Sequence, residues 1–193
     1  MAGLTVTEKA HWKDRIAARI DKAAERVKAG HPALFDRFRR DAHAEALRSL
    51  GLAEPHAELE ACRDEEATLA RRRKRAQRTM LAALRGVPVD EVADGFNVRY
   101  GTDLALPVEV FEAIARRQSA HQEQRMAADP VGREVVRLGA EKEGLLDAIW
   151  LATSPGQIRT LWTKVAELLG DEPTQLEREA LALPPIDAAA PPG

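Results

Sequence analysis

The chain of 193 residues has little of what exported and membrane-spanning proteins contain. It has one cysteine, Cys62, so no internal disulfide can form, and a lone thiol is typical of a reducing compartment. No stretch approaches 18 uncharged apolar residues, and the N-terminal segment has neither the basic nor the apolar region of a signal peptide. These absences predict a cytoplasmic protein without a membrane-spanning segment.

The chain also lacks an excess of charge and has few aromatic side chains. Charged residues make up 31% of it, yet the net charge is only −2, so no overall field favours a nucleic acid or a membrane. Aromatic residues account for 4%, and alanine, which favours helix but buries little surface, occurs 35 times. We therefore expect an all-α protein, an elongated helical bundle, in which Trp12, Trp150 and Trp162 anchor helices to one another.

Helix signals divide the N-terminal region into two helices. Thr5 and Glu8 have the spacing of a capping box, and apolar residues then recur about every four positions until Gly30. Pro32 marks the start of a second helix that ends at Gly51. The short link predicts an antiparallel hairpin, which would form an N-terminal domain of residues 1–52.

A third helix is predicted over residues 55–85, with a seam of alternating three- and four-residue steps. Residues 54–66 hold six acids and one base, whereas residues 67–89 hold seven bases and no acid. The next helix, 107–128, also begins acidic and ends basic, so antiparallel packing of the two would oppose unlike charges. We therefore expect a coiled-coil hairpin domain, residues 53–128, with a non-helical tip at 87–106.

The remaining part of the chain predicts a third helical domain, residues 129–170. Asp129-Pro130 and Ser154-Pro155 each combine an N-cap residue with a proline at the first helical position. They begin helices that run to about residue 152 and to Gly170, and the first of these carries a second heptad seam. Residues 171–193 are expected to form a short helix and a disordered tail rich in proline and alanine.

Few residues are spaced for catalysis or metal binding. Glu8 and His11 have the Glu-x-x-His spacing of di-iron bundles, but no second such pair occurs. Cys62 lies on the seam among acids, which is typical of a buried core thiol and not of an activated nucleophile. There is no phosphate-binding glycine loop or nucleophile elbow. We predict that the protein is not an enzyme and needs neither metal nor cofactor, and no small-molecule substrate is evident.

The basic run at 71–75 is the strongest local departure from average composition. Two interpretations are open: its cations are solvated or paired with acids of the same chain, or they contact a nucleic acid or an acidic protein partner. Five consecutive residues spread around a helix, which favours the first interpretation. The candidate contact residues for the second are Arg71, Arg72, Lys74, Arg75, Arg78 and Arg85.

The tip contains the sole tyrosine, Tyr100, and it allows two structures. Residues 89–104 loosely resemble a helix-turn-helix, which implies a recognition helix beginning at Arg99. A β-hairpin about Asp94-Gly95, with residues 89–92 facing 96–100, fits equally well. Candidate tip contacts are Phe96, Arg99 and Tyr100.

Taken together, these patterns favour a non-enzymatic helical interaction or scaffold protein that self-associates through its coiled-coil seams. The alternative is a nucleic-acid-associated, transcription-related protein that uses residues 71–85 and the helix-turn-helix-like segment 89–104. Its partner would thus be a second copy or another protein in the first case, and a nucleic acid in the second.

Overall fold

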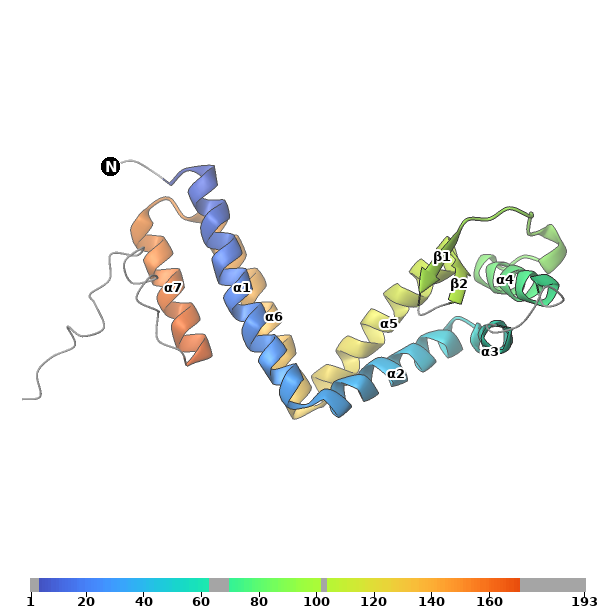
Figure 1. Ribbon diagram of the computed structural model, residues 1–193. Coiled ribbons are helices and arrows are strands. Elements are labelled where there is room, and N and C mark those ends of the chain that lie inside the picture. Colours follow the sequence, from blue (N-terminus) through green and yellow to red (C-terminus); the bar gives the residue numbers. More distant parts are fainter. Residues whose placement is uncertain (1–3, 63–69, 102–103, 171–193) are drawn as a thin grey trace, which may run out of the picture. The chain divides into compact units, whose positions relative to one another are not determined.

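A computed structural model describes residues 4–62, 70–101 and 104–170 (Figure 1). The elements are α1 (Val6–Gly30), α2 (Pro32–Ser49), α3 (Ala53–Ala61), α4 (Ala70–Arg85), the 3-10 turn η2 (Val89–Glu91), β1 (Val98–Gly101), β2 (Leu104–Pro107), α5 (Val108–Ala128), α6 (Pro130–Leu151) and α7 (Pro155–Leu169). The predicted all-α class is confirmed, since β1 and β2 are the only strands in the described ranges. No described helix is long and apolar enough to cross a membrane.

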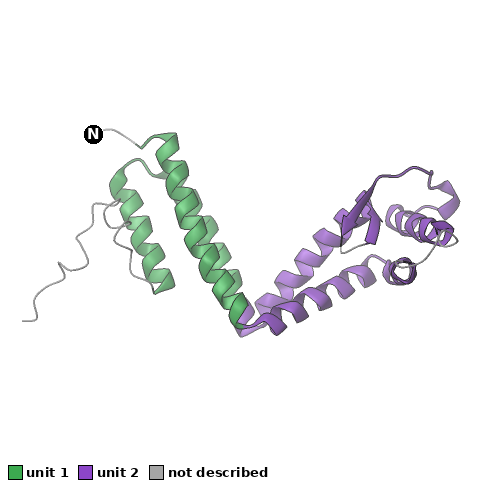
Figure 2. Cartoon of the chain, viewed as in Figure 1, with its two compact units in different colours: residues 1–30, 133–193 green, residues 31–132 purple. Residues whose placement is uncertain are grey.

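The chain divides into two compact units, coloured separately in Figure 2. The terminal unit comprises residues 1–30 and 133–193, and the central unit comprises residues 31–132. The predicted N-terminal hairpin differs from this division, because α1 and α2 belong to different units. The predicted short helix and tail at 171–193 lie outside the described residues.

The terminal unit packs α1, α6 and α7 around one apolar core. Each of the three helices contributes buried side chains to this core. They are Ile16 and Ile20 from α1, Leu138, Leu145 and Ile149 from α6, and Ile158, Trp162 and Val165 from α7. Trp162 is 1% exposed, and its ring meets Trp12 edge to face at 5.6 Å between centroids. The seam predicted for α6 is thereby buried within the unit, and its one charged member, Lys142, pairs with Asp21 at 2.8 Å.

The predicted caps explain where these helices begin and end. Glu8 accepts hydrogen bonds from the Thr5 backbone N–H and hydroxyl, both at 2.8 Å, which completes the first capping box. Ser154 and Gln157 form a second capping box at α7. Gly170 ends α7 in the left-handed conformation, with φ of 62°, as a glycine cap does.

The central unit is built on the antiparallel pair of α2 and α5 (Figure 1). Asp41 near the middle of α2 meets Arg125 at 3.4 Å, and His43 meets Gln118 at 3.1 Å, so the two helices run in opposite directions. Helix 107–128 therefore pairs mainly with α2. The prediction that its principal partner is the helix over 55–85 is wrong.

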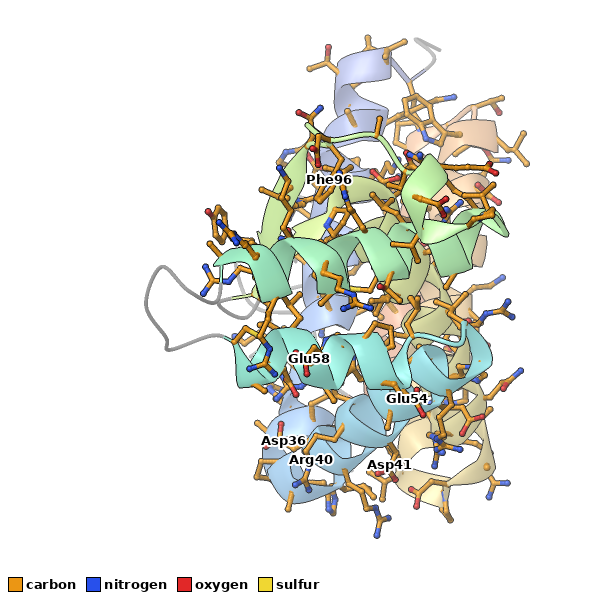
Figure 3. The ribbon with its side chains drawn as sticks, turned by 90° about the vertical axis from the view of Figure 1, so that its right-hand side faces the viewer. Asp36, Arg40, Asp41, Glu54, Glu58 and Phe96 are labelled. Carbon is orange, nitrogen blue, oxygen red and sulfur yellow. The ribbon has the colours of Figure 1, made fainter. Side chains whose placement is uncertain are left out.

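The expected continuous helix over 55–85 is also wrong, because α3 ends at Ala61 and lies beside α4 (Figures 1 and 3). Arg72 Nη2 is 2.7 Å from Glu58 Oε1. Residues 14 positions apart on one straight helix would be separated by about 21 Å along its axis. The ion pair thus requires two helices packed side by side.

The tip is a short antiparallel hairpin, with Val98 opposite Pro107 and Gly101 opposite Leu104. The recognition helix implied by the helix-turn-helix resemblance is wrong, because Arg99 lies in β1. The alternative hairpin is wrong in its pairing, since residues 89–91 form the 3-10 turn and not a strand. Leu104 and Leu106 are buried in the core of the unit, and a Cβ at Gly101 would collide with the Phe111 ring.

Candidate functional site

The basic run forms the first two turns of α4, and several of its cations bind groups within the chain. Arg72 pairs with Glu58 of α3, and Arg73 Nη2 donates a hydrogen bond to the Cys62 carbonyl at 2.7 Å. The carbonyl belongs to the residue that caps α3, where backbone acceptors have no helical partner. These contacts attach α4 to α3.

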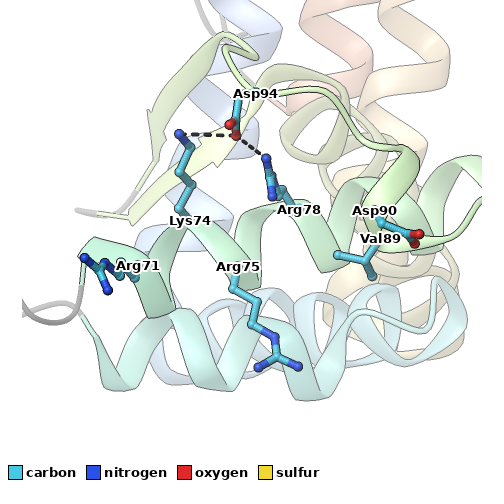
Figure 4. A pocket seen from close by; sticks show the side chains of 7 residues that line it. All are labelled: Arg71, Lys74, Arg75, Arg78, Val89, Asp90 and Asp94. Carbon is cyan, nitrogen blue, oxygen red and sulfur yellow. Dashed lines mark hydrogen bonds and ion pairs between the residues drawn. The ribbon is translucent and has the colours of Figure 1, made fainter.

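Two further cations converge on one carboxylate. Lys74 Nζ is 3.2 Å from Asp94 Oδ1, and Arg78 donates a hydrogen bond to the same oxygen (Figure 4). The hydrogen bond from Lys74, and then that from Arg78, holds the pKa of Asp94 below its ordinary value of 3.8. Gly95 follows with φ of 88°, a conformation that glycine adopts without strain, and it turns the chain after Asp94.

Arg85 closes the other end of α4 by bonding both carboxylate oxygens of Glu109 in the first turn of α5. Such a two-point contact is the strong geometry for a guanidinium and a carboxylate. The hydrogen bond from Arg85 lowers the pKa of Glu109, and the bond to Glu109 raises that of Arg85. The predicted attraction between the basic end of this region and the acidic start of 107–128 therefore appears in this pair.

Arg71 and Arg75 differ from the rest of the run: both are exposed, and their side chains have no hydrogen-bond or ion-pair partner within the described ranges. With Lys74, Arg78 and Asp90 they line an open pocket of about 510 Å³ (Figure 4). Pairing within the chain thus accounts for most of the six candidate contact residues. Of these six residues, Arg71 and Arg75 are the two without a partner among the described side chains.

The three candidate tip residues have different surroundings. Phe96 is partly buried against the core, and the Arg99 guanidinium lies over the Phe111 ring at 4.8 Å from its centroid. Tyr100 is 76% exposed, so its side chain does not pack into the end of the hairpin. Val98, on the same face of β1, is 40% exposed.

The hydrogen-bond pattern of the hairpin shows which edge of β1 is open. The Asn97 carbonyl accepts a hydrogen bond from the Val108 N–H at 3.0 Å. Because backbone groups alternate along a strand, the N–H and C=O groups of residues 97, 99 and 101 point toward the β2 side of the hairpin. The N–H and C=O groups of Val98 and Tyr100 therefore point away from it. On the opposite edge, Gln77 Nε2 donates to the Ala105 carbonyl at 2.7 Å. Gln77 of α4 thus caps one edge of the sheet, whereas no residue of the described ranges pairs with the backbone of the β1 edge.

The other residues singled out by spacing have structural surroundings. Glu8 is occupied by its capping box, where the backbone hydrogen bond from Thr5 lowers its pKa. His11 packs edge to face on Trp12. Cys62 is fully buried, as the sequence predicted. Within 4–62, 70–101 and 104–170, no three His, Cys, Asp or Glu side chains group closely enough to hold a metal ion.

The structure brings together two histidines that the sequence did not connect. The rings of His43 on α2 and His56 on α3 meet edge to face at 5.4 Å, and His43 Nδ1 is 3.1 Å from Gln118 Oε1 on α5. Burial lowers the pKa of His56 below 6.5, the charge of Glu60 opposes this, and that of His43 adds to it. No spacing rule could have found this cluster, because His43, His56 and Gln118 come from three different helices.

These side chains line a pocket of about 580 Å³ between α2, α3, α5 and the hairpin, called here the histidine pocket. Its lining residues are Arg39, Arg40, His43, Ala44, Leu47, His56, Glu60, Gly101, Leu106, Phe111, Ile114, Ala115 and Gln118. Its volume is in the range of sites for small molecules, and apolar groups dominate its wall, as is usual for such sites.

Comparisons of the chain with protein-family models, with curated proteins and with solved structures found no match.

Proposed function

We propose that the protein is a non-enzymatic helical interaction protein that self-associates, and that the open edge of β1 is the contact. The observation that carries this proposal is the pair of outward-facing residues Val98 and Tyr100, each with an exposed side chain and with backbone groups directed away from β2. An edge of this kind is a template for another strand.

The heptad seams, through which self-association was expected, are less suited to the task. The α6 seam residues Leu138, Leu145 and Ile149 are at most 7% exposed within their own unit. A second copy could reach them only by displacing α1 or α7. The β1 edge needs no such rearrangement.

A second copy fits the β1 edge through a two-fold axis. In an antiparallel β1-to-β1 pair, Val98 of one copy lies opposite Tyr100 of the other, and the reverse holds at the second position. Both positions present outward backbone groups, so four inter-chain hydrogen bonds can form. Aromatic and β-branched side chains are also favourable cross-strand partners.

The test is the molar mass in solution, measured by light scattering across a dilution series. The wild type should approach the mass of two chains as concentration rises. Val98→Pro removes an outward N–H at an edge position that tolerates proline, and Tyr100→Lys places a charge opposite Val98 of the second copy, so both should remain single chains.

The control is Leu151→Lys, which alters a side chain of similar exposure, 79%, in the terminal unit. It should dimerise as the wild type does. A wild type that stays monomeric throughout the series, or a Leu151→Lys variant that loses dimerisation as completely as Tyr100→Lys, would contradict the proposed contact.

A second candidate function, association with a nucleic acid, is favoured only by the unpaired Arg71 and Arg75 at the open pocket. Two cations would neutralise about two phosphates, giving a salt slope near −2 in logarithmic units. Fluorescence polarisation of a labelled duplex at low and high salt measures this dependence of binding on salt. Arg71→Ala with Arg75→Ala should abolish binding, whereas Arg37→Ala with Arg117→Ala, also exposed, should not.

A further inference from the structure

We propose that the histidine pocket binds a small amphiphilic carboxylate, with its apolar body against α5 and the hairpin and its carboxylate on Arg40. This inference is independent of the proposed self-association. It rests on the shape of the pocket, the nature of its wall and the state of the charges at its rim.

The body of the pocket is apolar and formed by side chains of the core. Leu47 of α2, Leu106 of β2 and Ile114 of α5 are each less than 10% exposed and belong to the core of the unit. Phe111 adds an aromatic face that packs against Gly101 of β1. Apolar surface of this kind favours an alkyl chain or an aromatic ring over a fully polar ligand.

The polar groups inside the pocket are few and oriented. The amide oxygen of Gln118 can only accept, so its contact with His43 Nδ1 places a proton on that nitrogen. This fixes the ring of His43 between α2 and α5. His56, 5% exposed, lines the pocket next to it, with its ring in edge-to-face contact with that of His43.

The charged side chains at the rim of the pocket favour a ligand with an anionic group. Arg39 is held by Asp36 at 2.9 Å, whereas Arg40 is exposed and has no partner among the side chains described. Figure 3 shows Asp36 and Arg40 on the same stretch of α2. Glu60 is the only acid of the lining, and it faces His56. One available guanidinium matches one carboxylate, which it can bind through two parallel hydrogen bonds.

Other classes of ligand fit less well. A nucleotide or sugar phosphate carries at least two negative charges and many hydroxyl groups, whereas the pocket offers one unpaired cation and a mainly apolar wall. A neutral hydrocarbon would leave Arg40 without a partner. The combination of an apolar body and one negative charge satisfies both parts of the site.

The experiment is a titration of the full chain with octanoate, followed through the imidazole ring resonances of the histidines by NMR. The resonances of His43 and His56 should shift and saturate, while those of the exposed His31 should not move. 1-Octanol has the same alkyl body without the charge, and it should bind about tenfold more weakly, as expected for the loss of one charge-assisted contact.

Two variants distinguish the contribution of the rim to ligand binding from that of the apolar wall. Arg40→Gln removes the charge and should weaken octanoate binding about tenfold while leaving 1-octanol unaffected. Ala115→Leu keeps a good helix former and adds bulk to the lining, so it should prevent binding of both. Arg37→Gln, on the same helix but outside the pocket, is the matched control and should bind octanoate as the wild type does.

Three outcomes would overturn the proposal. The first is that no ring resonance of His43 or His56 shifts with octanoate in the folded wild type. The second is that Arg40→Gln and Arg37→Gln bind octanoate equally. The third is that 1-octanol binds as tightly as octanoate, because the guanidinium would then have no part in recognition.

Discussion

The terminal unit and the central unit are stabilised by different kinds of contact. In the terminal unit, three helices share a core in which Trp162 contacts Trp12, and the guanidinium groups of Arg15 and Arg19 lie over the Trp162 ring. The core of the central unit consists mainly of small and aliphatic residues. Ion pairs such as that between Glu58 and Arg72 connect its helices to one another.

The difference bears on function because both proposed surfaces lie in the central unit. Its core has no tryptophan, and its short hairpin leaves backbone groups open at one edge and a pocket beside α5. The terminal unit has capping boxes at the starts of α1 and α7, and the apolar seam of α6 is buried within it. Four pairs of substitutions test how far this contrast extends.

The largest expected effect is in the terminal unit. Trp162→Ala should lower the free energy of unfolding by about 3–5 kcal/mol, because it removes a fully buried ring and leaves a cavity. Trp150→Ala should change it by less than about 1 kcal/mol, since that ring is 44% exposed. Urea unfolding followed by circular dichroism measures both. Equal losses would contradict the assignment of Trp162 as the anchor.

Replacing each of two glycines by alanine should change the free energy of unfolding in opposite directions. Gly101→Ala, in the central unit, forces a methyl group into the Phe111 ring and should destabilise the fold by about 1–3 kcal/mol. Gly139→Ala, on α6, meets no atom and should stabilise it by about 0.5–1 kcal/mol. Thermal unfolding of the two variants compares them. A stabilising Gly101→Ala would show that the hairpin does not pack on α5 as described.

The buried histidine predicts a pH dependence confined to the central unit. Burial lowers the pKa of His56 in the folded protein, with the charge of Glu60 opposing and that of His43 assisting. The unfolded chain therefore binds more protons as the pH falls through the ordinary value of 6.5, and stability is lost in that direction. Above 6.5 the full stability is present.

The variant His56→Gln should remove this part of the dependence. Between about pH 5 and about pH 8, the urea midpoint of the wild type should rise relative to that of the variant. His31→Gln, at an exposed position, serves as the control and should follow the wild type at both values. A difference that is constant with pH would exclude His56 as the titrating group.

The smallest expected effect on stability is that of Asp94→Asn. The carboxylate is exposed, and exposed ion pairs contribute little and are screened by salt. A slight fall in the midpoint of thermal unfolding should disappear at high salt. Asp90→Asn, at the same pocket but without an ion pair among the described residues, should show no such fall. A loss that persists in high salt would indicate a packing role for Asp94.

The helices with clear caps were predictable because their end signals are local. Thr5 with Glu8, Ser154 with Gln157 and the left-handed Gly170 each act within a few residues of the helix end that they define. The buried position of Cys62 followed from its place on an apolar seam. Such features depend on sequence neighbours and not on the rest of the fold.

The break between α3 and α4 was not predictable from periodicity. Leu59 and Met80 contribute to one core, so their spacing is compatible with one long helix or with two helices lying side by side. The polarised charge of 54–85 was also ambiguous. It suits the dipole of a single helix, but in the structure Glu58 pairs with Arg72 across two helices.

The candidate sites were predictable only in part. The basic run and Tyr100 stand out in the sequence, but the acids that neutralise Lys74 and Arg85 come from other elements. His43, His56 and Gln118 are far apart in the chain and gave no signal. A pocket assembled from three helices and a hairpin depends on their packing, which single-sequence patterns do not specify.

The hydrogen bond from Gln77 to Ala105 has a consequence for the size of any assembly. It occupies the outward carbonyl of β2, and the neighbouring Pro107 has no N–H to offer. The sheet can therefore grow in one direction only. If two copies join through β1 as proposed, the outward edge of β2 offers a further strand only the Ala105 N–H and the Pro107 carbonyl, and the expected product is a closed pair and not a fibre.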